Sequence, residues 1–440
     1  MFKWFKSQPE QPVTKTNEEI NQLYRYWRIH IMIALYVGYA IFYFTRKSFN
    51  YVMPVMLEDL GMKVTDVGIL TTCFALVYGA SKFISGMMSD KSNPRYFMGI
   101  GLILTGISNI LFGFSSSLIL FICLWILNAF FQGWGWPPAI KSLTVWYSRK
   151  ERGFWYAIAN TSHNVGGALI PLLAGGLAVH FSWRYGMIVP GTIGIIAGLI
   201  VIWRLRDRPV SMGLPTVGEW RNDPLELEQV NNSKKMPMSQ ILIHYIFTNK
   251  LIWLLAISNI LIYIVRIGLN DWTNLYLVRE YNYDLVKANS ALSLFEIGGF
   301  FGTMVAGWGS DVLFKGNRTP MNIIFMIGIG VAAALLWIFP DLGYGLVAAC
   351  FFVIGFFVFG PQMLIGIAAA EVAHKDSAGT ANGFVGLFGY IGAAFAGYPL
   401  SKIIESTGWS GFFITMIVST LLSALILVPM LKMKKANVTF

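Results

Sequence analysis

Residues 27–47, WRIHIMIALYVGYAIFYFTRK, decide the fold class, because a run of mostly apolar residues leads directly into Arg46. A second run, residues 251–267 (LIWLLAISNILIYIVRI), leads into Arg266, which follows Arg46 by half the length of the 440-residue chain. About 20 apolar residues suffice to cross a bilayer. A guanidinium at that depth costs at least about 2.5 kcal/mol to insert, so each arginine is expected to be functional. The simplest partner for both is an anion held between two halves of a duplicated chain.

The composition supports a membrane protein. Hydrophobic residues make up 55% of the chain and charged residues 12%, which is typical of a polytopic membrane protein rather than a large soluble one. The net charge of +11 does not predict nucleic-acid binding, because the basic residues fall in short loops between apolar runs. No signal peptide is recognised at the N-terminus. Cys73, Cys123 and Cys350 lie in apolar runs, so no disulfide framework is expected.

Charge and turn clusters divide the chain into twelve expected spans. They are 27–48, 67–90, 96–114, 118–141, 154–178, 184–203, 250–276, 288–311, 320–339, 343–370, 379–401 and 409–431. The expected organisation is therefore an all-α membrane protein of two pseudo-symmetric six-helix bundles. Its parts are a cytoplasmic N-terminal segment 1–26, a bundle 27–203, a cytoplasmic linker 204–249, a bundle 250–431 and a tail 432–440.

The loop charges predict the orientation in the membrane. When both termini are placed in the cytoplasm, most of the 33 Lys and Arg residues fall in cytoplasmic segments. Cytoplasmic loops of membrane proteins carry such an excess. We therefore expect both termini, and the linker between the bundles, in the cytoplasm.

The segments 86–95 and 307–318 share a pattern of a glycine, an aspartate and basic residues. This repeat is a second sign of duplication. Small residues allow two helices to approach closely, and an aspartate at a helix end beside basic loop residues can form a charge latch that opens and closes. The alternative is a pair of ordinary solvated loops. The expected gating residues are Gly86, Asp90, Lys91 and Arg95 in the first half, and Gly307, Asp311, Lys315 and Arg318 in the second.

Several stretches resemble the major facilitator superfamily and, within it, the organophosphate:phosphate antiporters. The resemblance covers essentially the whole chain and comes closest to the bacterial hexose-phosphate sensor-transporter branch, with glycerol-3-phosphate and hexose-6-phosphate carriers as near relatives. The stretches that carry it are Gly38–Lys47, Ser81–Phe83, Phe131–Pro138, His163–Gly167, Arg266 with Asn270–Trp272, and Gly360–Gly366.

The resemblance implies that Arg46 and Arg266 clamp a phosphate group. A guanidinium offers a rigid fork of donors to phosphate oxygens, which agrees with this role. The alternative is that each arginine snorkels or binds a helix carbonyl.

The resemblance also places His163 in the substrate site, where a charged imidazole could donate to phosphate. The alternative is a neutral histidine bonded to a neighbouring helix, for which Asn160 and Asn164 are available. Lys82 is expected in the cavity, and several tyrosines share a helical face with a cation. The remaining expected ligand-binding residues are Tyr39, Tyr43, Tyr78, Gln132, Trp136, Asn160, Tyr263 and Tyr390. Phe359 stands where some relatives carry a tyrosine, and residues 382–390 lack the acid or lysine of dedicated hexose-phosphate carriers.

Three further charged residues lie at membrane depth. Lys47 and Arg46 are adjacent, so they point about 100° apart on a helix and cannot both face one phosphate. We expect Lys47 to pair with Asp271 or Glu296 from the other half, in contacts that hold one conformation and release in the other. The alternative for these carboxylates is a proton relay in a proton-coupled carrier.

The predicted function is exchange of a phosphorylated sugar, such as hexose 6-phosphate, for inorganic phosphate by alternating access. The alternative is a membrane receptor for external hexose phosphate that signals through a sensor kinase with little transport. An enzyme is not expected, because no nucleophile, metal cluster or phosphate-binding glycine loop has a catalytic arrangement. No cofactor, metal or nucleic-acid partner is expected. We expect a monomer in the bacterial cytoplasmic membrane, in contact with the lipid bilayer.

Overall fold

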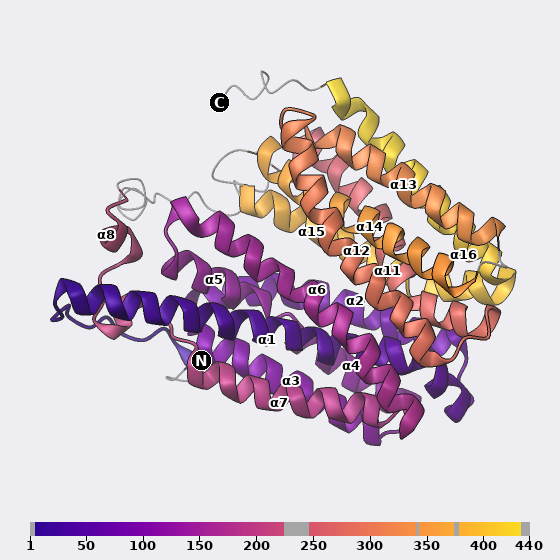
Figure 1. Cartoon of the computed structure of the whole chain (residues 1–440), viewed down its shortest axis with the longest axis horizontal. Coiled ribbons are helices and arrows are strands. Elements are labelled where there is room, and N and C mark those ends of the chain that lie inside the picture. Colours follow the sequence, from indigo (N-terminus) through magenta and orange to yellow (C-terminus); the bar gives the residue numbers. More distant parts are fainter. Residues whose placement is uncertain (1–4, 224–245, 340–342, 374–377, 433–440) are drawn as a thin grey trace.

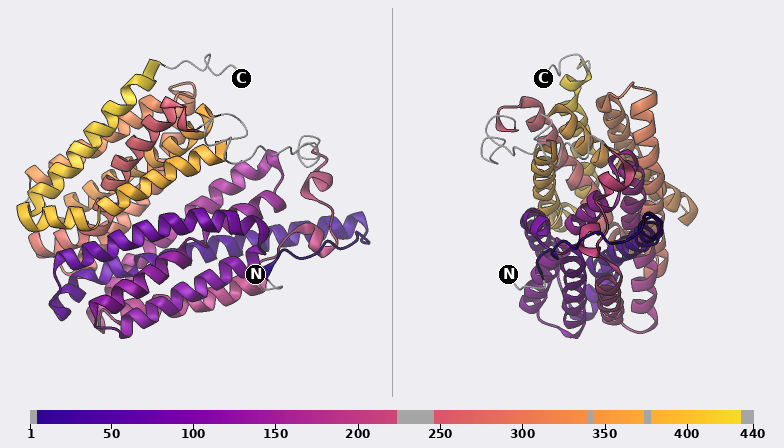
Figure 2. Two further views of the ribbon diagram at one scale, coloured as in Figure 1. Left: turned by 180° about the vertical axis from the view of Figure 1, so that it is seen from behind. Right: turned by 90° about the vertical axis from the view of Figure 1, so that its left-hand side faces the viewer.

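The structure, a computed structural model of the whole chain, describes residues 5–223, 246–339, 343–373 and 378–432. Figures 1 and 2 show long helices in two groups that lie side by side, one from each half of the sequence. Within the described ranges the one β pairing is an isolated bridge between Lys6 and Ser92. The expected all-α class is confirmed.

The first group contains α1 (Asn17–Leu60), α2 (Val64–Lys91), α3 (Pro94–Phe114), α4 (Leu118–Gln132), α5 (Trp136–Trp146), α6 (Arg149–His180) and α7 (Tyr185–Arg204). The second contains α11 (Lys250–Glu280), α12 (Leu285–Val312), α13 (Arg318–Ile338), α14 (Tyr344–Val372), α15 (Ala378–Phe395) and α16 (Tyr398–Leu427). Between the groups lie the short helices η2 (Pro209–Met212) and α8 (Val217–Arg221), and η5 (Val428–Lys432) follows α16.

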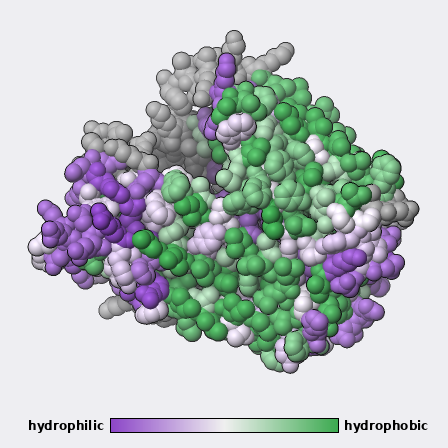
Figure 3. Space-filling view, in the orientation of Figure 1, coloured by the Kyte–Doolittle hydropathy of each residue, from purple (hydrophilic) through white to green (hydrophobic). Residues whose placement is uncertain are grey.

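Eleven helical segments of the described residues are long and apolar enough to cross a membrane. The last, Thr380–Leu431, has 52 residues, about twice the length that one crossing requires. It includes α15 and α16, and α16 is interrupted at Gly408, whose φ of 69° is not helical. Dividing the segment there gives the twelve predicted crossings. Figure 3 agrees, since a broad hydrophobic surface separates hydrophilic patches at opposite ends of the molecule.

Helix α1 is longer than the predicted span 27–48. It has 44 residues, or about 66 Å, so it extends well beyond the hydrocarbon core. It begins at a capping box formed by Thr16 and Glu19 and ends at Gly61 in the left-handed conformation. The difference arises because hydropathy marks only the apolar part of a helix, whereas the caps set its ends. Arg46 therefore lies well inside α1 rather than near its end.

The predicted span 118–141 is two helices. Helix α4 ends at Gln132 and α5 begins at Trp136, followed by Pro137 and Pro138 in its first turn, where proline is tolerated. A side chain at Gly133 would collide with Ser81 and with the backbone of Lys82, so α2 packs directly against the break.

The first part of the segment 204–249, which is the expected cytoplasmic linker, is packed against α1. The ring of Trp220 stacks on Tyr24 at 4.1 Å, and the Tyr24 hydroxyl donates to the carbonyl oxygen of Pro215 at 2.6 Å. Lys15 donates to the carbonyl oxygen of Met212 at 2.7 Å. Residues 224–245 of this linker, and 433–440 of the predicted tail, lie outside the described residues.

Contacts between the two halves gather at the end of the helices that carries loops 61–63 and 281–284, here called the outer end because the termini are predicted to be cytoplasmic. The Asn289 amide donates to the carbonyl oxygens of Tyr51 (3.0 Å) and Pro171 (3.2 Å). The Thr72 hydroxyl donates to the carbonyl oxygen of Ala394 at 2.7 Å. Figures 1 and 2 show the halves diverging toward the opposite end. The structure is therefore closed at its outer end.

Gly397 allows a close approach of two backbones at this outer end. A Cβ atom there would lie 2.6 Å from the backbone nitrogen of Thr72 and 2.7 Å from the carbonyl oxygen of Gly68. Gly397→Val is therefore expected to destabilise the closed outer end by about 1–3 kcal/mol. Pulsed electron resonance between spin labels on the exposed residues 63 and 406 should report longer distances than in the parent chain. Gly176→Val is the matched control, because a Cβ there meets nothing within 4 Å; an equal opening in both variants would refute the assignment.

Candidate functional site

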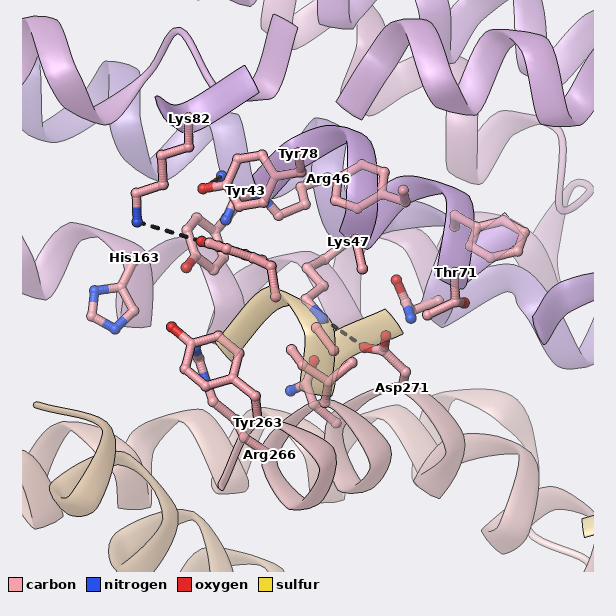
Figure 4. A pocket seen from close by; sticks show the side chains of 18 of the residues that line it. Tyr43, Arg46, Lys47, Thr71, Tyr78, Lys82, His163, Tyr263, Arg266 and Asp271 are labelled. Carbon is pink, nitrogen blue, oxygen red and sulfur yellow. Dashed lines mark hydrogen bonds and ion pairs between the residues drawn. The ribbon is translucent and has the colours of Figure 1, made fainter. Parts of the chain in front are cut away.

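A pocket with a cavity volume of about 190 Å³ lies between the two halves (Figure 4). This is smaller than the roughly 300–1,000 Å³ of pockets for drug-sized ligands, so it suits a small one. Every residue predicted to bind ligand lines it except Gln132. Those lining it are Tyr39, Tyr43, Arg46, Tyr78, Lys82, Trp136, Asn160, His163, Tyr263, Arg266 and Tyr390.

Arg46 is held in place by neutral groups. Its Nε donates to Gln132 Oε1 at 3.2 Å and its Nη2 to the Tyr78 hydroxyl at 2.9 Å. The guanidinium also lies over the rings of Tyr43 (4.6 Å) and Tyr78 (4.4 Å). Within the described residues it forms no ion pair with a carboxylate, so its charge is oriented but not neutralised.

Gln132 lies behind Arg46 rather than in the pocket, which differs from its predicted role in ligand contact. Its amide donates to Thr45 Oγ1 at 2.9 Å and to the Phe42 carbonyl oxygen at 3.2 Å, which leaves Oε1 to accept from Arg46. Because both ends of the amide are fixed by α1, Gln132 sets the direction of the Arg46 fork.

Arg266 extends from α11 on the other side of the pocket. Its guanidinium lies over the ring of Phe359 at 4.7 Å and farther from Tyr263 at 5.9 Å. It forms no hydrogen bond or ion pair with any other described residue. The five N–H donors of the guanidinium therefore remain available to an anion.

His163 and Lys82 complete the basic lining. His163 Nδ1 is hydrogen-bonded to the carbonyl oxygen of Asn160, one turn earlier in α6. A carbonyl oxygen only accepts, so Nδ1 carries the proton and Nε2 has no partner among the described residues. Lys82 Nζ lies 3.4 Å from the Tyr390 hydroxyl, which comes from the other half.

Lys47 and Asp271 form an ion pair between the halves, with 2.6 Å between Nζ and Oδ1. Glu296, which is 2% exposed, instead accepts from the Asn270 amide at 3.2 Å, and its second carboxylate oxygen has no hydrogen-bond partner among the described residues. Both carboxylates line the pocket. Their part in conformational change or in proton transfer remains a prediction.

The predicted gating loops are only partly described. Arg318 pairs with Asp311 and with Glu371, both in its own half. Arg95 donates to the carbonyl oxygen of Ile202, and Lys315 lies in a turn with a φ of 53°. The side chains of Asp90 and Lys91 lie outside the described residues.

The two gating glycines are not at close helix contacts in this conformation. A Cβ on Gly86 would meet nothing within 4 Å, and one on Gly307 only the end of Met363 at 3.5 Å. The role of these loops as a charge latch therefore remains a prediction.

Other residues that line the pocket are not among those predicted from the sequence to bind ligand. These residues include Asn50, Thr71, Phe74, Trp125, Asn270 and Gln362. Helical spacing holds a usable signal for two of them, since Asn50 follows Arg46 by one turn and Thr71 precedes Tyr78 by two.

The charges of the lining favour an anion. Four basic side chains, Arg46, Lys47, Lys82 and Arg266, face two carboxylates. The charges of Lys47 and Asp271 cancel, which leaves three cationic side chains and the carboxylate of Glu296. A phosphate ester carries about −1.5 to −2 charges at pH 7, which matches this excess. The pocket is therefore suited to a small phosphorylated or otherwise dianionic ligand.

Comparison with known proteins identifies the class. The chain belongs to the major facilitator superfamily, whose family model matches residues 35–397. It is 53% identical to the "Membrane sensor protein UhpC" of Escherichia coli (strain K12) over 98% of each chain. It is 48% identical to a "Probable hexose phosphate transport protein" of Chlamydia trachomatis, over 94% of this chain and 92% of that relative.

A solved structure supports the same fold. The chain matches a bacterial homologue of the human lysosomal transporter Spinster with a TM-score of 0.68 at 17% identity, over 92% of this chain and 95% of the other. The predicted superfamily, its organophosphate transporter group and the fold are thus confirmed. The chain is a multi-pass membrane protein of a family of transporters and sensors, not of enzymes.

Proposed function

We propose that this protein is a membrane receptor for a phosphorylated hexose, built on a transporter fold. The observation that carries the proposal is the pair Arg46 and Arg266, one from each half, which line one pocket without a carboxylate partner in an ion pair among the described residues. The comparisons favour a receptor over the exchanger predicted from the sequence, because this chain is more similar to the sensor of Escherichia coli than to the transport protein of Chlamydia trachomatis.

The ligand would be held by its phosphate group. Guanidinium forks bind phosphate oxygens through paired, charge-assisted hydrogen bonds, and Arg46 is already oriented by Gln132 and Tyr78. Arg266 and Lys82 would supply further donors, and His163 would add one from Nε2 when its imidazole is protonated. Binding would thereby join the two halves, 27–203 and 250–431, through one shared anion.

Signalling would then follow from a shift between conformations. A ligand moves such an equilibrium only by its difference in affinity for the two states. We propose that closure of the halves around the phosphate is the event that a partner, such as a membrane sensor kinase, detects. The protein would act in the bacterial cytoplasmic membrane with both termini inside.

Exchange of sugar phosphate for inorganic phosphate is the second candidate. The named transport function of the Chlamydia trachomatis relative favours it. In the empty state the clamp cations repel each other across the cavity, which opposes closure. A bound anion removes that repulsion, so reorientation would need ligand and transport would be one-for-one.

A measurement of glucose 6-phosphate transport distinguishes the receptor from the exchanger. The purified chain would be placed in liposomes loaded with phosphate, and uptake of labelled glucose 6-phosphate measured beside binding to the same protein in detergent. A receptor is expected to bind glucose 6-phosphate while its uptake stays at the level of the Arg46→Lys variant. Uptake that is fast and requires internal phosphate would instead establish the exchanger. Absence of binding to any phosphorylated compound would refute both.

A further inference from the structure

The outer part of the pocket contains polar groups that lack partners. The Thr71 hydroxyl and the Asn50 side-chain amide both line the cavity, and neither forms a hydrogen bond with another described residue. The indole N–H of Trp125 is likewise unpaired within the described part of the chain. All three side chains are largely buried but line the open cavity, so their hydrogen-bonding groups are available to whatever occupies it.

These groups lie on the outer side of the phosphate-binding cations. In α2, Thr71 precedes Lys82 by three turns, or about 16 Å along the helix axis. In α1, Asn50 follows Arg46 by one turn toward the outer end. Figure 4 shows the same order, with Thr71 on the side opposite Lys82 and His163. The pocket therefore has two ends of different chemistry.

The charge of the two ends differs as well. Arg46, Arg266 and Lys82 belong to the inner end, whereas the charges near Thr71 are Lys47 and Asp271, which neutralise each other at 2.6 Å. An anionic phosphate is attracted to the first end and gains little at the second. The outer end thus suits the uncharged part of a ligand.

Aromatic rings form one wall of the outer end. Trp125 packs against Phe49 with 5.1 Å between ring centroids and against Phe74 with 5.3 Å, and all three line the cavity. A sugar ring presents C–H groups on its faces and hydroxyls on its edge. Rings on one side with hydroxyl, amide and indole N–H groups beside them match that amphipathic shape.

We infer that Asn50, Thr71 and Trp125 form a sugar subsite that binds the hydroxyls of a hexose whose phosphate group lies at the cations. This inference rests on the proposed ligand class and adds the residues that select it. Inorganic phosphate has no hydroxyl-bearing carbon chain to reach the outer end, and glycerol 3-phosphate offers only two hydroxyls to these three groups. The subsite would let the protein respond to hexose phosphate in the presence of free phosphate.

The test compares three ligands on the purified full-length chain in detergent: glucose 6-phosphate, glycerol 3-phosphate and inorganic phosphate. Thr71→Val removes the hydroxyl at nearly constant shape, and Trp125→Phe removes the N–H but keeps an aromatic ring. Each variant should weaken glucose 6-phosphate binding about tenfold, while inorganic phosphate binding changes less than about twofold. Thr71→Ser should restore hexose phosphate binding. Thr192→Val in α7, exposed and away from the pocket, is the matched control.

The outcomes are distinguishable. If glucose 6-phosphate binds the Thr71→Val and Trp125→Phe variants as tightly as the parent, the sugar subsite is refuted while the receptor proposal stands. Equal weakening of inorganic phosphate would also overturn it, because the residues would then support the pocket rather than the sugar. If the parent chain binds phosphate but not glucose 6-phosphate, the proposed function fails together with the inference.

Discussion

Replacing Arg46 or Arg266 by lysine is expected to weaken phosphate binding by about 100-fold. An ammonium lacks the planar fork, so at least one charge-assisted hydrogen bond, worth about 1.5–3 kcal/mol, is lost. In Arg46→Lys, the Gln132 and Tyr78 groups that orient the guanidinium would also lose their partner. Each 1.4 kcal/mol changes the dissociation constant tenfold. Titration of the purified chain with labelled phosphate measures the loss.

The matched control for these variants is Arg25→Lys. Arg25 is exposed on the part of α1 that precedes the predicted span, so its replacement should leave binding unchanged. Near-parental phosphate affinity in both Arg46→Lys and Arg266→Lys would refute the clamp. Loss in only one of them would mean that a single half holds the anion.

Breaking the Lys47–Asp271 pair is expected to open the outer end. The two side chains are 12% and 8% exposed, and removal of one partner from such a buried pair typically costs 3–5 kcal/mol because the other charge is left alone. In Asp271→Asn, Lys47 is left without its partner. Spin labels on the exposed residues 63 and 280, at the outer ends of the two halves, should move apart.

The double variant Lys47→Gln with Asp271→Asn distinguishes the effect of losing the ion pair from the effect of leaving one charge unpaired. It contains no unpaired charge, so it should open the outer end less than Asp271→Asn does. Asp311→Asn is the control, since Asp311 pairs with Arg318 within one half and away from the outer end. Equal opening in the single and double variants would contradict a role for the ion pair.

The sequence was enough to predict the fold and the basic residues of the pocket. Arg46, Arg266 and Lys82 stand out because a charge inside an apolar run is costly and therefore carries information by itself. Tyr39, Tyr43, Tyr78 and Tyr263 followed from helical spacing to those cations, whereas Tyr390 was expected from the family resemblance. All of them line the pocket.

Other features depended on packing that one sequence does not encode. Gln132 resembles a ligand-binding residue in its motif, but the contact of α4 with α1 turns its amide toward Thr45 and Arg46. The sequence does not distinguish Asn50 and Thr71 from other polar residues of a helix, because it does not show how deep the cavity extends along α1 and α2. The ends of α1 could not be read from hydropathy, because caps rather than apolar residues set them.

The closed outer end has a consequence for sensitivity. A ligand arriving from the outer side cannot enter this conformation, so it binds only the fraction of molecules that are open to that side. Its apparent dissociation constant is the intrinsic one divided by that fraction, which makes it about 100-fold weaker if one molecule in a hundred is open. The concentration at which the protein binds an external ligand is then set partly by Asn289, Gly397 and the other outer contacts, which do not line the pocket. Evolution could adjust the threshold there while the binding chemistry stays the same.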